Sequence, residues 1–126
     1  MTQLFLLLAA ILGGLSVGSG AFATHALREK LSERSLEIFE TGARYQMYHA
    51  LALLLVAVLL SRTESPPSAL VATGWLFIIG IAIFSGSLYA VSLTGVKSIG
   101  AIAPLGGAAF IAGWGALAFA AWSLKL

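Results

Sequence analysis

The side chains best suited to chemistry are two histidines and the polar residues between them. The first histidine ends a charge-free run in the stretch GAFATHAL, and the second lies in the stretch FETGARYQMYHALALL. Ionisable groups inside apolar segments are costly, so they tend to be paired with one another or functional. We therefore define a candidate polar cluster from these two stretches: His25, Glu40, Arg44, Tyr45 and His49.

The spacing within the second stretch predicts contacts along one helix. Glu40 precedes Arg44 by four residues, which is the favourable order for a helical ion pair. Tyr45 and His49 are also four apart. His25 and His49 flank the first loop, so we expect them at comparable depths. We expect His25 to face neither a loop nor lipid, but to close the polar end of the bundle with the other four residues of the cluster.

Three interpretations of the histidines remain open. His49 can be a buried, hydrogen-bonded histidine that holds two helices together, which is the interpretation we favour. It can also carry protons or bind a ligand, since histidine titrates near neutral pH. The five cluster residues would then serve a small transporter or a binder of a lipid-like ligand, which is the alternative to the auxiliary or structural role that we expect. A zinc site is the third, but zinc needs three or four ligands, and only the two histidines with Glu37 or Glu40 are available. For His25 the simplest role is an anchor at the membrane surface.

Composition removes several functional classes. The chain has no cysteine, which excludes disulfides, thiolate nucleophiles and cysteine-bound metals. A net charge of +2, scattered along the chain, does not indicate nucleic-acid binding. No nucleophile elbow, phosphate-binding loop or HExxH motif is present. We expect no catalytic residue, cofactor or metal, and therefore a protein that is not an enzyme.

The balance of apolar and charged residues indicates a membrane protein. Hydrophobic residues make up 60% of the 126 residues, charged residues make up 10%, and the mean hydropathy is +0.99. A soluble domain of this size leaves too much of its surface in water to hide so many apolar side chains. The lipid bilayer is therefore the expected surroundings of the chain.

Long apolar stretches between charges predict one domain, residues 1–126, with an all-α fold of four transmembrane helices. A spanning helix needs about 20 apolar residues, and the expected helices cover about 4–23, 33–60, 67–93 and 99–122. The first stretch resembles a signal peptide in having Ala21-Phe22-Ala23, but no Lys or Arg precedes its apolar core. We expect it to be retained as a span.

Local signals predict where these helices begin, end and bend. Ser32 can cap the second helix, and prolines 66 and 67 suit the start of the third. Gly95 is expected to end the third helix and make a tight hairpin with the fourth. Pro104 is expected to bend the fourth helix.

Small residues recur every four positions in three of the spans. In lipid, helices associate through close backbone approach, which small residues allow. The rows therefore predict a packed bundle, and they offer faces for a homo-oligomer. The rows are Gly14-xxx-Gly18, Ala82-xxx-Gly86-xxx-Ala90 and Ala108-xxx-Ala112-xxx-Ala116-xxx-Ala120.

The basic residues predict an orientation. If the helices alternate, five Lys and Arg residues lie with the first and third loops: Arg28, Lys30, Arg34, Arg44 and Lys97. Arg62 and Lys125 lie on the opposite side. Because cytoplasmic loops carry the excess of Lys and Arg, we expect a multi-pass protein of the bacterial inner (plasma) membrane, with its first loop in the cytoplasm and both termini outside.

Three ordered motifs resemble a known family. They are GAFATHAL at 20–27, FETGARYQMYHALALL at 39–54 and GSLYAVSLTGVKSIGAIAPLGGAAFIAGW at 86–114. Together they resemble the YgdD-like family of small membrane proteins, a domain-of-unknown-function family. The resemblance implies a four-helix membrane protein, and it brings no activity, cofactor or catalytic residue. Thr24 stands where the family usually has glycine before the first histidine.

Overall fold

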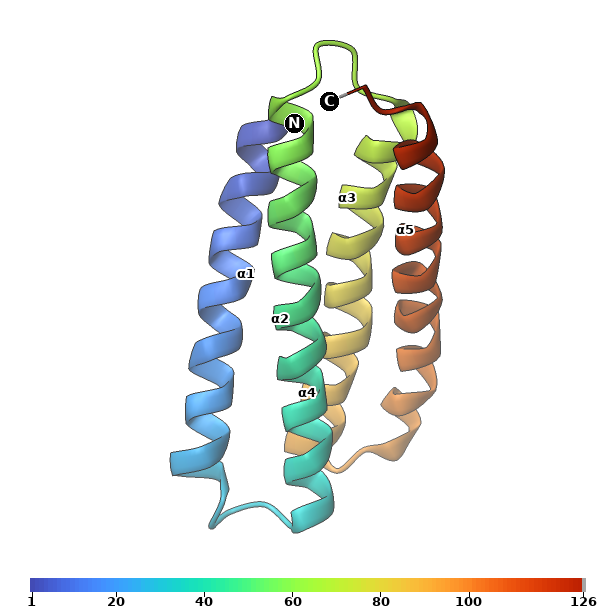
Figure 1. Cartoon of the computed structure of the whole chain (residues 1–126). Coiled ribbons are helices and arrows are strands. Elements are labelled where there is room, and N and C mark those ends of the chain that lie inside the picture. The colour runs from blue at the N-terminus through green and yellow to red at the C-terminus, as the bar shows by residue number, and fades with distance from the viewer. Residues whose placement is uncertain (126) are drawn as a thin grey trace.

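The computed structural model describes residues 1–125 and contains only helices and their connections within that range (Figure 1). Four helical spans are long and apolar enough to cross a membrane: Thr2–Leu27, Glu33–Ser61, Ser68–Thr94 and Lys97–Ser123. The predicted fold class, an all-α bundle of four transmembrane helices, is confirmed.

Three of the spans contain a change in helix type. The first consists of α1 (Thr2–Phe22) and a π-helical turn, η1 (Ala23–Leu27), and the second is α2 (Glu33–Ser61) throughout. The third consists of α3 (Ser68–Gly80), the π-helical turn η2 (Ile81–Ser85) and α4 (Gly86–Thr94). The fourth begins with a 3₁₀-helix, η3 (Lys97–Ile102), and continues as α5 (Ala103–Ser123).

The helix ends follow the sequence signals. The Ser32 hydroxyl accepts the backbone N–H of Ser35 at 3.1 Å, which caps α2 as expected. α3 begins directly after Pro67. Gly95 ends α4 with φ of 72°, a left-handed conformation that favours glycine. Each of these three signals acts through the local backbone, so the sequence alone predicts it.

The bend expected at Pro104 stays a prediction, but the structure places this proline at the start of α5 rather than in the interior of a helix. Pro104 lies in the first turn of α5, where a proline costs no helical hydrogen bond, because the preceding residues form the 3₁₀-helix η3. The fourth span therefore changes helix type before the proline.

The four spans stand side by side, and α2 is the central one (Figure 1). It packs against α1 on one side and against α3, η2 and α4 on the other, while α3 and η2 also pack against α5. Both termini lie at the end of the bundle where α2 connects to α3, and the α1–α2 connection lies at the opposite end, which we call the first-loop end (Figure 1). The position of α2 explains why more of its residues are buried than those of any other element.

Glycines let phenylalanines pack closely between the spans. A Cβ added at Gly113 would lie 2.6 Å from the ring of Phe77, and one at Gly106 would overlap the backbone of Phe84. Phe77 is fully buried in the main apolar core, with Phe5 and Leu53. The α3–α5 and η2–α5 contacts thus depend on glycine at these positions.

These are not the glycines that the four-residue spacing selected. A Cβ at Gly14, Gly18 or Gly86 would meet nothing within 4 Å. Ala82, Ala108 and Ala112 are exposed, whereas Ala120 is buried. The prediction that the small-residue rows pack this bundle is therefore wrong for most of their members, because spacing finds a helix face but not what that face meets.

Candidate functional site

His49 is buried in the middle of the bundle, and both of its ring nitrogens are hydrogen-bonded. Nδ1 lies 2.8 Å from the backbone carbonyl oxygen of Tyr45, and the indole N–H of Trp114 donates to Nε2 at 3.1 Å. An indole nitrogen can only donate, and a carbonyl oxygen can only accept. The arrangement therefore requires a neutral imidazole with its proton on Nδ1, and it joins α2 to α5.

Aromatic rings fill the remaining space around His49. The Phe110 ring stacks on the imidazole with centroids 3.6 Å apart and an angle of 10° between planes. The Phe77 ring meets it edge-on at 5.3 Å. With both nitrogens engaged, Phe110 stacked on one face and its side chain buried, this histidine matches the favoured interpretation of a buried residue that holds helices together.

A second set of hydrogen bonds crosses from α1 through α2 to α4. The Gln46 amide donates to the Leu12 carbonyl oxygen of α1 at 2.8 Å and accepts the Tyr89 hydroxyl of α4 at 2.7 Å. Two serines add bonds to α2 carbonyl oxygens, Ser16 to Ala43 and Ser85 to Gly42. We call Ser16, Gln46, His49, Ser85, Tyr89 and Trp114 the central polar network.

The central polar network is closed. Among residues 1–125, no buried side-chain nitrogen or oxygen lacks a hydrogen-bond partner. An unsatisfied polar group at membrane depth costs several kcal/mol, so each of these bonds favours one arrangement of the helices. Within the same range, no group of three His, Asp or Glu residues could hold a metal ion.

The structure does not unite the five residues of the candidate polar cluster. His25 lies in η1 and its side chain is exposed, so the prediction that it closes the bundle with His49 is wrong. η1 packs near Phe39 of α2, and ten residues of helix, about 15 Å, separate Phe39 from His49. The two histidines were expected at similar depths, but α2 carries His49 much deeper.

The predicted pairs within the cluster are also different from those observed. Glu40 and Arg44 form no ion pair in the described part of the chain; instead Arg34 pairs with Glu37 at 3.5 Å. Tyr45 bonds to the His49 ring through its backbone carbonyl oxygen rather than through its hydroxyl. Glu40 is half-buried, and Arg44 and Tyr45 are exposed. Whether any of the five residues has a functional role stays a prediction.

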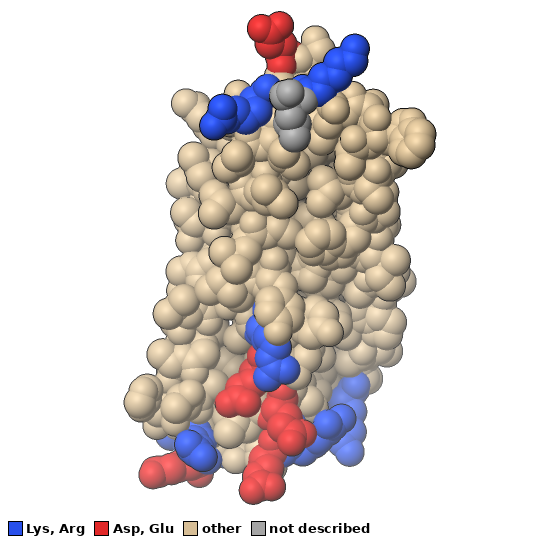
Figure 2. Space-filling view, in the orientation of Figure 1, with Lys and Arg blue, Asp and Glu red and all other residues tan. Residues whose placement is uncertain are grey.

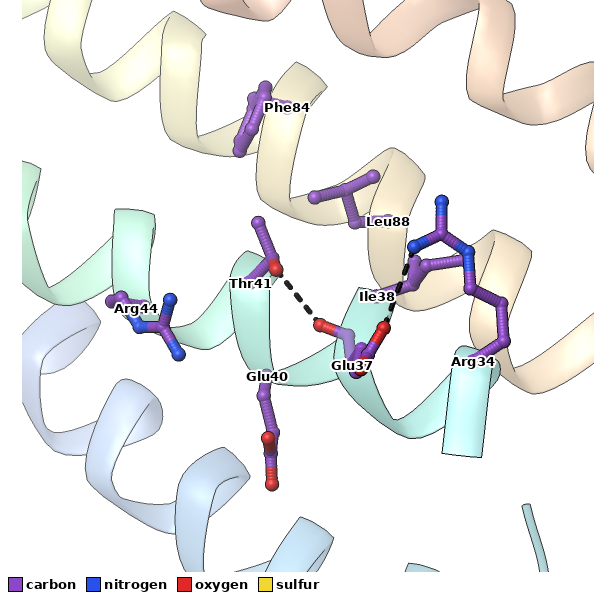
Figure 3. A pocket seen from close by; sticks show the side chains of 8 residues that line it. All are labelled: Arg34, Glu37, Ile38, Glu40, Thr41, Arg44, Phe84 and Leu88. Carbon is purple, nitrogen blue, oxygen red and sulfur yellow. Dashed lines mark hydrogen bonds and ion pairs between the residues drawn. The ribbon is translucent and has the colours of Figure 1, made fainter. Parts of the chain in front are cut away.

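Glu40 and Arg44 instead line a second region, at the first-loop end. Figure 2 shows that charged side chains gather at the two ends of the molecule, and on the face shown those at the first-loop end extend toward the uncharged middle. A hollow of about 460 Å³ lies here (Figure 3), lined by Arg34, Glu37, Ile38, Glu40, Thr41, Arg44, Phe84 and Leu88. α2 supplies its charged side and η2 and α4 supply its apolar side.

Sequence reasoning selected only His49 from the central polar network and missed its other five members: Ser16, Gln46, Ser85, Tyr89 and Trp114. A signal for Trp114 was present, since it lies 17 residues after the start of its span at Lys97, and His49 lies 16 residues after the start of α2 at Glu33. Both spans begin at the first-loop end, so nearly equal counts place the two residues at similar depths. The choice of partner still depends on which helices are neighbours, which the sequence does not state.

Comparison with known proteins gives a family match. Residues 19–107 match the family described as "Protein of unknown function (DUF423)". The UPF0382 membrane protein YwdK of Bacillus subtilis is 46% identical over 112 residues, which are 89% of this chain and 90% of that protein. A UPF0382 membrane protein of Staphylococcus haemolyticus is 43% identical over 112 residues, 89% of each chain. No solved structure matches.

Proposed function

Because this chain belongs to the DUF423 family of membrane proteins, for which no activity is known, we propose from its own geometry that it has a structural or auxiliary role and no enzymatic activity. The observation that carries this proposal is the closed central polar network. A reaction or a transport path needs polar groups that can change partners. His49, the one ionisable imidazole in the interior, is engaged at both nitrogens by the protein itself.

The positions of the hollows support the same role. The charged hollows lie at the two ends of the bundle, and the apolar one lies in the seam between α1 and α2. Of the central polar network, Ser16 lines the hollow against α1, and the other five members line none of these hollows. A protein that moves ions or protons through its interior would expose such residues to a water-filled path.

His49→Phe tests the proposal, because it keeps the ring and its stacking but removes both nitrogens. We expect the free energy of unfolding in detergent to fall by about 1–3 kcal/mol, since the Trp114 N–H loses its partner. Proteoliposomes with the wild-type protein should show no proton flux above empty liposomes. Proton flux through the wild type that disappears in the His49→Phe variant would overturn the structural role and favour a transporter.

The resemblance to YgdD-like proteins is part of this proposal. We place those proteins in the DUF423 family, because residues 19–107 of this chain, which match that family, include two of the three resembling motifs in full.

We also propose that the protein lies in the bacterial plasma membrane with its first loop in the cytoplasm and both termini outside. The support is the excess of Lys and Arg at the first-loop end. Cysteines introduced at Ser32 and Ser65 should react with impermeant reagents from opposite sides; labelling of Ser32→Cys from outside intact cells would reverse the orientation.

The exposed small-residue rows support a further part of the proposal, association of two copies in the bilayer. Ala108 and Ala112 of α5 are exposed, so their close-approach surface is free in a single copy. Small residues at such spacing let helices meet in lipid. Because the chain has no cysteine, Ala112→Cys should form a disulfide-linked dimer in oxidised membranes if this face is the contact. The control is Ala118→Cys, also exposed but about 120° around the helix from Ala112. Equal dimer yields from the two variants would exclude this face.

A further inference from the structure

Three neighbouring hollows at the first-loop end share one residue, Glu40. The first is the 460 Å³ hollow between α2 and α4 (Figure 3). A second, of about 320 Å³, lies toward the first loop and includes Arg28, and a third, of about 310 Å³, lies against α1 and includes Ser16 and Thr24. Arg44 lines the first and the third. Glu40 and Arg44 therefore sit between hollows on one exposed face of α2.

The charges in this region are only partly neutralised by the protein. The Arg34 guanidinium reaches the Glu37 carboxylate, and Glu40 and Arg44 lie apart from that pair (Figure 3). Neither Glu40 nor Arg44 has an ion-pair partner among residues 1–125. Charged side chains near membrane depth normally pair with one another or with another charged group. A ligand with one negative and one positive group would satisfy both.

An apolar groove follows the α1–α2 seam toward the middle of the bundle. Its volume is about 310 Å³, and it is lined by Ala9, Ala10, Gly13, Gly14, Val17, Met47, Ala50, Leu51 and Leu54. Small residues keep it open, because a Cβ at Gly14 would meet nothing within 4 Å. Val17 is one turn from Gly20, and Met47 is one turn from Ala43; Gly20 and Ala43 line the charged hollow next to α1. The groove thus begins one helical turn from Arg44.

We propose that this face binds a membrane phospholipid whose headgroup carries both a phosphate and a primary ammonium. The phosphate lies on the Arg44 guanidinium, the ammonium lies on the Glu40 carboxylate, and one acyl chain occupies the α1–α2 groove. Arginine forms strong charge-assisted hydrogen bonds with phosphate oxygens. A primary ammonium can donate to a carboxylate, whereas a quaternary ammonium has no N–H to donate. The proposal goes beyond the structural role and does not depend on it.

The experiment is native mass spectrometry of the delipidated protein in detergent. The protein is mixed with equal amounts of three phospholipids that have identical acyl chains and carry ethanolamine, choline or glycerol headgroups. The wild type should retain the ethanolamine lipid several-fold more than the other two. Arg44→Gln should reduce retention of that lipid about tenfold, the loss expected for one charge-assisted contact. Glu40→Gln should make the ethanolamine and choline lipids equal.

Matched controls separate this site from general lipid adhesion. Arg62→Gln removes an exposed arginine at the opposite end of the bundle and should leave retention unchanged. Gly14→Leu fills the groove and should reduce retention, whereas Gly115→Leu, which also meets nothing within 4 Å in α5, should not. Each variant should show a cooperative melting transition in lipid-free detergent, which is the check that it is folded.

Several results would overturn the proposal. One is equal retention of the three lipids by the wild type, and another is equal behaviour of Arg44→Gln and Arg62→Gln. Displacement of the lipid by soluble phosphoethanolamine at the same concentration would assign the charged hollow to a free phosphate-amine compound. A dimer peak that disappears with Gly14→Leu but not with Gly115→Leu would assign the groove to a second copy of the chain.

Discussion

The middle of the bundle and its first-loop end use polar residues of α2 in different ways. In the middle, Gln46 and His49 bond to partners on three other spans, and no buried polar side-chain atom in residues 1–125 lacks a partner. At the first-loop end, Glu40 and Arg44 line hollows and form no ion pair within that same range. Only ten residues of one continuous helix, from Glu40 to His49, separate the two kinds of behaviour.

The difference follows from where each region can find water. In the middle, a polar group without a partner would lie in hydrocarbon, so the sequence supplies a partner for each one. At the end, long charged side chains can reach water or lipid headgroups, so an internal partner is not required. Polar groups whose hydrogen bonds are all made inside the protein hold the helices in register. Glu40 and Arg44, which have no ion-pair partner in residues 1–125, remain available to a ligand.

The largest expected effect comes from forcing the spans apart beside the central network. Gly106→Ala should lower the free energy of unfolding by about 3 kcal/mol or more, because the new methyl group overlaps the backbone of Phe84, which cannot move aside like a side-chain tip. Gly107→Ala is the control, since its Cβ would lie 4.0 Å from Phe84. It should leave stability unchanged or raise it by up to about 1 kcal/mol through helix propensity. Equal melting temperatures in detergent would show that the helices are not packed as described.

The next effect tests whether the central polar network acts as a unit. Gln46→Leu should cost about 1–3 kcal/mol, because it leaves the Tyr89 hydroxyl without its acceptor. In the Gln46→Leu variant, Tyr89→Phe should cost about 0.6 kcal/mol less free energy of unfolding than it costs in the wild type. A coupling of that size is typical of hydrogen bonds within membranes. Ser87→Ala is the control, since that hydroxyl donates within its own helix to Phe84. Coupling of Gln46 to Ser87 as large as to Tyr89 would mean that the cycle does not report the hydrogen bond.

Features that depend on one segment were predictable from the sequence. The number of spans follows from apolar length, and the caps at Ser32 and Gly95 follow from local backbone chemistry. The same is true of the buried, bonded role of His49, because an imidazole in an apolar span must be satisfied internally.

Features that depend on neighbouring helices were not predictable. The sequence placed His25 and His49 at one depth because both flank the first loop, but α2 begins only at Glu33 and carries His49 about 24 Å along its axis. The small-residue rows had a correct spacing for packing, yet the close contacts use Gly106 and Gly113 instead. Spacing describes one helix, and the identity of the facing helix decides which of its faces is buried.

The smallest expected effect on the protein alone is at the first-loop end. In lipid-free detergent, Arg44→Gln and Glu40→Gln should each change the free energy of unfolding by less than about 0.5 kcal/mol, because neither charge has an ion-pair partner in residues 1–125 to lose.

The two regions should differ again when the ethanolamine phospholipid is added. A ligand that binds only the folded state stabilises it by about 2.7 kcal/mol at 100 times its dissociation constant. The wild type and Gln46→Leu should both gain melting temperature with lipid, since Gln46 lines none of the hollows, and Arg44→Gln should gain little. If Arg44→Gln instead destabilises the lipid-free protein as much as Gln46→Leu does, then Arg44 already has a partner inside the protein. In that case the first-loop end is as closed as the middle.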